Sequence, residues 1–178
     1  MAKQYSEITD KQQQFIEQQY IFFIGTADKD GKVSVSPKGI DSLRILDKNR
    51  IVWVNYTGSG NETAAHMLAT NRMTIMFCSF TEKTLILRIY GSGKVIYPKD
   101  DNWQELEKLF PESISNRQYF DINVDLVQTS CGFGVPLFDY KGERDLLLEW
   151  ANKKGTEGIK AYWKNENKLS IDGKNTGI

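Results

Sequence analysis

The hydrophobic and polar residues in the first half of the chain follow the two-residue period of β-strands. Residues 20–27 form a β-branched and aromatic segment, and residues 32–37 alternate between polar and apolar side chains. Asp30-Gly31 lies between them, and this dipeptide is typical of a hairpin turn because glycine accepts a positive φ. A second turn is predicted at residues 47–50, between two further short apolar segments. The pattern therefore predicts antiparallel strands joined by tight turns.

Three further strands are predicted at residues 73–80, 85–97 and 121–129. Gly91 and Gly93 interrupt the second of them, and a glycine pair inside a strand indicates a bulge or a sharp bend. One face of the third is expected to carry Ile122, Val124, Leu126 and Gln128. Strands at such short spacing predict an antiparallel barrel or sandwich.

Helical segments are predicted to flank these strands. The pair Thr9-Asp10 is suited to cap a first helix, and apolar residues at helical spacing predict a second at residues 61–70. The pair Asp100-Asp101 is suited to cap a third helix, which Pro111 ends.

The chain changes character after residue 136. Residues 142–162 predict one or two amphipathic helices with a break near Gly155, and residues 165–178 are polar and predict an extended tail. We expect one domain over residues 1–178, mainly β with flanking helices, and a helical C-terminal extension from about residue 140.

Composition narrows the classes of partner. Hydrophobic residues make up 40% of the 178 residues and charged residues 26%, as in an ordinary globular protein. Basic and acidic residues both number 23, so we expect no nucleic acid and no membrane partner, because both depend on excess positive charge. The N-terminal residues are polar and lack an apolar signal core, which indicates the cytoplasm.

Few residues suit metal or hydrolytic chemistry. His66 is the only histidine, and no thiol or carboxylate cluster accompanies it, so no metal site is expected. Cys78 and Cys131 are interpreted as one buried and one loop thiol, both reduced. No glycine-rich dinucleotide fingerprint or P-loop is present.

The segment at residues 53–63 is the most informative part of the chain. A strand ends there, and a loop rich in hydroxyl, amide and glycine residues leads directly into a helix. The N-terminus of a helix favours an anion, because its N–H groups are free and its dipole is positive there. The alternative is an ordinary capped loop, with Ser59 or Asn61 as the N-cap.

A second candidate lies at the end of a neighbouring predicted strand. Ser36 and Pro37 precede Lys38, whose ammonium group could neutralise a phosphate. If the strands pair, Lys38 points to the same end of the barrel as the loop. The alternative is a solvated surface lysine.

Five motifs in the same order resemble the pyridoxamine 5′-phosphate oxidase-like family of FMN-binding split β-barrels. They are Ile24-Gly-Thr-Ala27, Val33-Ser-Val-Ser-Pro-Lys-Gly39, Asn55-Tyr-Thr-Gly-Ser-Gly-Asn-Glu-Thr63, Asn71-Arg-Met-Thr-Ile-Met-Phe77 and Leu87-Arg-Ile-Tyr-Gly-Ser-Gly93. The resemblance implies an antiparallel split β-barrel of six or more strands. It also implies a homodimer that holds FMN at its interface.

The resemblance assigns roles by position. Lys38 would contact the FMN phosphate or ribityl chain, and Arg88 lies in a strand that borders the site. Ser36 and Pro37 would line the strand beside the ring, while Asn55 and Tyr56 precede the phosphate loop. That loop would contain Thr57, Ser59, Asn61, Glu62 and Thr63. No catalytic side chain is assigned, because the flavin does the chemistry.

The sequence differs in two places from the true pyridoxamine phosphate oxidases, and both differences argue against vitamin B6 oxidation. Gly60-Asn61-Glu62 stands where the true oxidases are arginine-rich, and the C-terminus lacks their Arg-x-His segment. The chain is more similar to a branch that carries the segment at residues 130–137, from Ser130 to Leu137.

Two functions from different classes remain open. The first is an FMN-dependent oxidoreductase that passes hydride or electrons between a nicotinamide donor and a small organic acceptor. The second is a non-catalytic flavin or tetrapyrrole carrier or sensor, in which His66 is the one available histidine ligand. Trp53, Tyr56 and Phe133 are candidates to pack near a flavin ring, or alternatively belong to the core.

Overall fold

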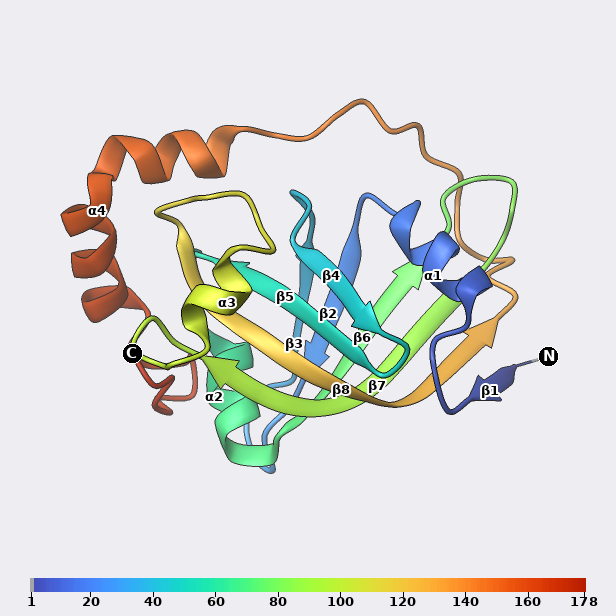
Figure 1. Ribbon diagram of the computed structural model, residues 1–178, viewed down its shortest axis with the longest axis horizontal. Coiled ribbons are helices and arrows are strands. Elements are labelled where there is room, and N and C mark those ends of the chain that lie inside the picture. Colours follow the sequence, from blue (N-terminus) through green and yellow to red (C-terminus); the bar gives the residue numbers. More distant parts are fainter. Residues whose placement is uncertain (1) are drawn as a thin grey trace.

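In residues 2–178, which the computed structural model describes, eight strands form one antiparallel sheet. Its order is β3-β2-β6-β7-β8-β5-β4, and β1 pairs with β8. The sheet curls around the core (Figure 1), so the expected antiparallel barrel architecture is confirmed. The strands are β1 (Lys3–Tyr5), β2 (Phe22–Thr26), β3 (Ser34–Lys38), β4 (Leu43–Asp47), β5 (Arg50–Tyr56), β6 (Arg72–Cys78), β7 (Ile86–Ile96) and β8 (Asn116–Ser130).

The expected glycine irregularity lies where β7 meets β8. The register shifts between Tyr90 and Gly91, which pair with Leu126 and Val124, so Asp125 is left as an extra residue. The extra residue reverses which side chains of β8 face the core beyond this point. Val127 is accordingly buried, whereas Leu126 is only half-buried. The predicted apolar face is therefore correct before the bulge and wrong after it.

Four helices accompany the sheet in the described part of the chain: α1 (Asp10–Glu17), α2 (Glu62–Thr70), α3 (Trp103–Glu107) and α4 (Leu146–Glu166). Thr9 caps α1, and its partner Gln12 completes a capping box. The break predicted near Gly155 is confirmed, since its φ of 69° interrupts α4. The cap predicted for α3 is wrong, because Asp100 instead accepts a hydrogen bond from the Tyr97 N–H and the helix starts later.

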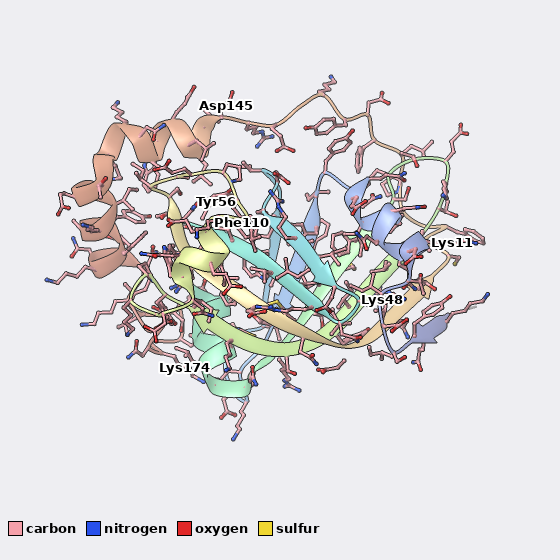
Figure 2. The ribbon with its side chains drawn as sticks, viewed as in Figure 1. Lys11, Lys48, Tyr56, Phe110, Asp145 and Lys174 are labelled. Atoms are coloured by element: carbon pink, nitrogen blue, oxygen red, sulfur yellow. The ribbon has the colours of Figure 1, made fainter. Side chains whose placement is uncertain are left out.

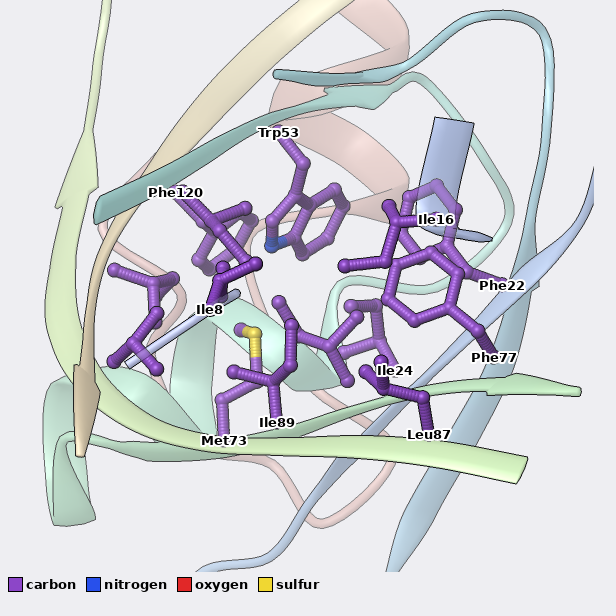
Figure 3. Packing of buried hydrophobic residues seen from close by; sticks show 14 of the residues in the cluster. Ile8, Ile16, Phe22, Ile24, Trp53, Met73, Phe77, Leu87, Ile89 and Phe120 are labelled. Carbon is purple, nitrogen blue, oxygen red and sulfur yellow. The ribbon is translucent and has the colours of Figure 1, made fainter. Parts of the chain in front are cut away.

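The core lies inside the curled sheet. Trp53 stacks on Phe120 with ring centroids 4.4 Å apart, above the aliphatic side chains drawn in Figure 3. The apolar face of α1 contributes Phe15 and Ile16 to this core, and α2 packs against β2, β6 and β7. Trp53 is thus a core residue, which follows from its complete burial.

The C-terminal region runs along the barrel and then folds back onto it. An irregular arm from residue 131 to residue 145 crosses the top of the view in Figure 1 and leads into α4. The extended tail predicted for residues 165–178 is wrong, because Leu169 bridges to Asn175 and the chain turns at Gly173, where φ is 74°. Polar contacts with distant loops, which local pattern does not reveal, hold this turn in place.

The two cysteines and the helices can also be compared with the sequence-based expectations. Cys78 is buried, Cys131 is exposed and both are free thiols, as expected. Among residues 2–178, no helix combines the length and the apolar character needed to cross a bilayer.

Candidate functional site

A polar cleft of about 650 Å³ opens between β3, the loop after β5 and the residues after α4. Most of the residues singled out in the sequence line it: Ser36, Lys38, Asn55, Tyr56, Ser59, Asn61, Glu62 and Thr63. The wall also includes Val35, Arg117, Leu169 and Ile171, which the sequence pattern did not indicate. Segments far apart in the sequence therefore meet at one site.

The loop between β5 and α2 presents an uncapped helix N-terminus. Asn61 precedes α2, but its side chain makes no capping hydrogen bond with the described residues. Its Oδ1 instead accepts from Asn55 Nδ2 at 3.4 Å, and its Nδ2 donates to the carbonyl oxygen of Asn167 at 3.4 Å. The first N–H groups of α2 thus lack the side-chain acceptor of an ordinary capped loop, which favours binding of an external anion.

The carbonyl oxygens of this loop are held by protein donors. Arg117 Nη2 donates to Gly60 O at 3.0 Å and Nη1 donates to Gly58 O at 3.4 Å. Asn167 Nδ2 donates to Gly58 O at 3.0 Å and to Ser59 O at 3.4 Å. These bonds reduce the repulsion that free carbonyl oxygens would exert on an anion nearby.

Arg117 is the cation at this site that sequence reasoning missed. It lies near the start of β8, four residues before the strand predicted at residue 121, and only 2% of it is exposed. Its Nε is buried without a hydrogen-bond partner among the described residues. Burial lowers the pKa of the guanidinium, but an arginine remains charged at neutral pH. The sequence carries no local signal for it, because Arg117 reaches the loop only through the pairing of β8 with β5, in which Asn55 is opposite Gln118.

Lys38 supplies a second cation, which is half-buried. Burial is the main cause that lowers its pKa to about 8, and the charge of Arg117 adds to the shift while Glu62 opposes it. Its Nζ lies 5.5 Å from the ring centroid of Trp53, which favours the charged form. Within residues 2–178, no carboxylate forms an ion pair with Lys38 or Arg117.

The remaining polar groups complete a donor-rich surface. Ser36 Oγ is buried and has no partner among the described residues, although it lies on the cleft wall. The carboxylate of Glu62 accepts a hydrogen bond from the Ile171 N–H at 3.1 Å. Two carboxylates, those of Glu62 and Glu166, line the cleft together with Lys38 and Arg117. Neither cation forms an ion pair within residues 2–178, which suits an anionic ligand.

Three residues from the predicted set do not line this cleft. Pro37 faces a separate cavity of about 940 Å³ beside α1 and the arm. Thr57 is fully buried, where its Oγ1 donates to Ser115 O and accepts from Trp163 Nε1 at 2.7 Å. Arg88 lies on β7, where Nη1 donates to Ser130 Oγ at 3.4 Å. The structure therefore gives Thr57 and Arg88 hydrogen bonds to residues that do not line the cleft.

The candidate ring-packing residues and the single histidine lie in different places. Phe133 is 80% exposed on the arm, whereas Tyr56, labelled in Figure 2, lies at the end of β5 and lines the cleft. His66 is only 1% exposed, and its Nδ1 is hydrogen-bonded to Thr26 Oγ1 at 3.0 Å. Among residues 2–178, no group of three or more His, Cys, Asp or Glu side chains is arranged to hold a metal ion.

Known proteins are similar to this chain in sequence and in fold. Residues 8–131 match the family model described as pyridoxamine 5′-phosphate oxidase. The pyridoxamine 5′-phosphate oxidase family protein ustO of Aspergillus flavus is 34% identical over 140 residues. That match covers 76% of this chain and 56% of ustO, so the chain spans little more than half the length of this relative.

Solved structures share the fold at low sequence identity. A protein of Lactobacillus delbrueckii assigned to the pyridoxamine 5′-phosphate oxidases has a TM-score of 0.57, over 69% of this chain and 94% of that one. A single-residue variant of HupZ from Group A Streptococcus has a TM-score of 0.56, over 69% and 99% of the two chains. Both are 18% identical to this chain, so their likeness concerns the fold alone.

Proposed function

The chain belongs to the pyridoxamine 5′-phosphate oxidase family, and on this premise we propose that its polar cleft binds FMN and that the protein is an FMN-dependent oxidoreductase. The proposed reaction passes electrons between a nicotinamide donor and a small organic acceptor. The match covers only 56% of ustO, so this reaction is proposed for the present chain and not transferred from that relative.

One observation carries the proposal. Half-buried Lys38 and buried Arg117 are two cations at the same cleft, and no carboxylate in the described chain forms an ion pair with either. Burying a charge that has no ion-pair partner is costly, so a site of this kind is stabilised by an anion that enters from solution. A phosphate offers several acceptor oxygens to such cations, and each charge-assisted bond contributes roughly 1.5–3 kcal/mol.

The other groups at the cleft fit the rest of FMN. Ser36 Oγ and Arg117 Nε are buried without partners, and both suit an acceptor-rich ligand. The side chains of Asn55 and Ser59 are polar neighbours suited to ribityl hydroxyl groups. Val35 provides an apolar surface, 68% exposed, for a flat ring.

Bound FMN would supply the electron transfer, while the chain would bind and orient it. Lys38 and Arg117 would hold the phosphate, and the polar loop would fix the chain that joins phosphate to ring. Glu62 replaces the basic residues of the true oxidases and adds negative charge beside this site. We therefore propose an acceptor other than a vitamin B6 phosphate.

We also propose that two copies of the chain associate. β3 is an edge strand of the sheet, and Val33 and Val35 are 72% and 68% exposed. Of these two valines, Val35 lies on β3 itself and Val33 directly precedes it. An exposed edge with apolar side chains supports pairing with another surface. Sedimentation should give a dimer, and Val33→Glu should give a monomer, whereas Leu46→Glu at the opposite edge should leave the dimer intact. A monomeric wild-type protein would overturn this proposal.

The function is tested in two steps. Titration of FMN with the purified chain should quench flavin fluorescence with saturation at one FMN per chain. The loaded protein is then mixed with NADH or NADPH in the presence of oxygen, and nicotinamide oxidation is followed by absorbance. Oxidation supports the oxidoreductase, whereas tight binding without turnover would favour the flavin carrier instead.

A further inference from the structure

The C-terminal hairpin, Asn167–Thr176, packs against the candidate phosphate loop. It lies outside the part of the chain that matches the family, which ends at residue 131. Ser170 N donates to Lys174 O at 2.8 Å, and the bridge between Leu169 and Asn175 closes the turn. Although the hairpin is polar, Asn167 and Thr176 are completely buried. This burial shows that the hairpin packs against the rest of the protein.

Asn167 is the main link from the hairpin to the loop. Its Nδ2 donates to Gly58 O at 3.0 Å and to Ser59 O at 3.4 Å. Its own carbonyl oxygen accepts from Asn61 Nδ2 at 3.4 Å and from Thr176 Oγ1 at 2.5 Å. One residue thereby contacts the loop at three positions and ties it to the end of the chain.

The hairpin is also anchored to the opposite side of the cleft. Lys174, labelled at the lower edge of Figure 2, forms an ion pair with Asp28, and Asp172 pairs with Lys32 at 2.7 Å. Both partners belong to the turn between β2 and β3, the strand that carries Lys38. The hairpin therefore connects the two walls between which an anion would bind.

Two apolar side chains of the hairpin line the cleft. Leu169 and Ile171 are 55% and 68% exposed, and Val35 on β3 lines the same cleft. Exposed apolar groups around a polar floor are stabilised by a ligand that has a charged end and a flat apolar body.

We propose that the C-terminal hairpin completes the flavin phosphate site of its own chain, with Asn167 as a positioning residue and with Leu169 and Ile171 covering the ring system. This inference rests on the proposed FMN binding. Asn167 keeps the carbonyl oxygens of Gly58 and Ser59 engaged, so that an incoming phosphate meets N–H groups and cations instead. The ring contacts add affinity that does not depend on the phosphate.

The test compares FMN with riboflavin, which lacks the phosphate. Asn167→Asp keeps the side-chain shape but replaces the donor with an acceptor beside two carbonyl oxygens. FMN affinity should fall tenfold or more, while riboflavin affinity changes less than threefold. Asn175→Ala is the matched control, because it removes an amide from the same hairpin without touching the loop, and it should leave both affinities unchanged. The double variant Leu169→Ser/Ile171→Ser should weaken FMN and riboflavin by the same factor.

A result that weakens FMN and riboflavin equally in Asn167→Asp would overturn the positioning role, because it would indicate a general loss of structure. Hydrogen exchange without ligand gives a second readout. The amides that flank the loop, Thr57 N–H bonded to Ser115 O and Ala65 N–H bonded to Asn61 O, should exchange at least tenfold faster in Asn167→Asp than in Asn175→Ala. Equal rates would overturn the inference. If the wild-type chain binds no FMN, the proposed function fails, while the exchange experiment still decides whether the hairpin holds the loop.

Discussion

Arg117 on β8 and Lys38 on β3 line the same cleft, although three strands, β2, β6 and β7, separate them in the sheet order. The curl of the sheet brings the two cations together, and the pKa of Lys38 is lowered first by burial and then by the charge of Arg117. Two like charges held together in a buried place destabilise each other. An anion bound between them removes this conflict, which is why the pair has predictable effects on ligand binding.

Removal of the lysine charge should weaken FMN binding. Lys38→Ala should cost roughly 1.5–3 kcal/mol, the value of a charge-assisted contact, which corresponds to about a tenfold to 150-fold rise in the dissociation constant. Fluorescence titration measures it. Lys11→Ala, on the exposed face of α1 at the right of Figure 2, is the control and should bind FMN like the wild type. An unchanged affinity in Lys38→Ala would remove the phosphate role of this residue.

FMN affinity should depend on pH because Lys38 titrates near pH 8 in the free protein. A bound phosphate raises the pKa of the lysine, so binding takes up a proton and weakens as the pH rises through 8. The affinity should be about tenfold lower at pH 9 than at pH 7. Lys38→Arg keeps the charge over this range and should flatten the profile. A flat profile in the wild type would be inconsistent with a titrating lysine at the phosphate.

Arg117→Gln should have two effects that can be separated. FMN binding should weaken by roughly 1.5–3 kcal/mol, because a charged donor is lost. The pKa of Lys38 should rise, because its repulsive neighbour is gone, so the inflection of the affinity profile should move above pH 8. Titrations across pH 7 to 10 measure both. An inflection that stays in place would show that the two cations do not interact.

Stability should be sensitive to the close approach at the β7–β8 bulge. A Cβ at position 93 would collide with the Asp121 carbonyl oxygen and lie 2.8 Å from the Ile122 Cα. Gly93→Ala should therefore lower the free energy of unfolding by about 1–3 kcal/mol, as overpacking does. Urea denaturation measures this change. Gly134→Ala is the control, since no atom lies within 4 Å of its added Cβ. Equal stability of the two variants would contradict the packing seen at the bulge.

The elements that could be predicted from sequence are those with local signals. Asp30-Gly31 marked the first hairpin, Thr9 marked the start of α1 and Gly155 marked the break in α4. The polar loop before α2 was recognisable because its hydroxyl, amide and glycine residues are consecutive. Each of these features depends on backbone preferences within a few residues, which a sequence displays directly.

The parts of the site that could not be predicted depend on long-range contacts. Arg117 donates to a carbonyl 57 residues away, and Asn167 donates to one 109 residues away. A buried arginine in a strand has the same local pattern as an exposed one, and a polar segment with glycine resembles a loose tail until its partners are known. The curl of the sheet, which brings β3 and β8 together, is a property of the whole barrel.

The most direct test of the proposed function is the identity of the chromophore that the purified protein carries. The chain is isolated without added cofactor, its visible spectrum is recorded, and the pigment released on denaturation is identified and quantified. We predict FMN, either released in a near one-to-one ratio to the chain or bound in that ratio after addition. A colourless protein that also fails to bind added FMN would contradict the central claim.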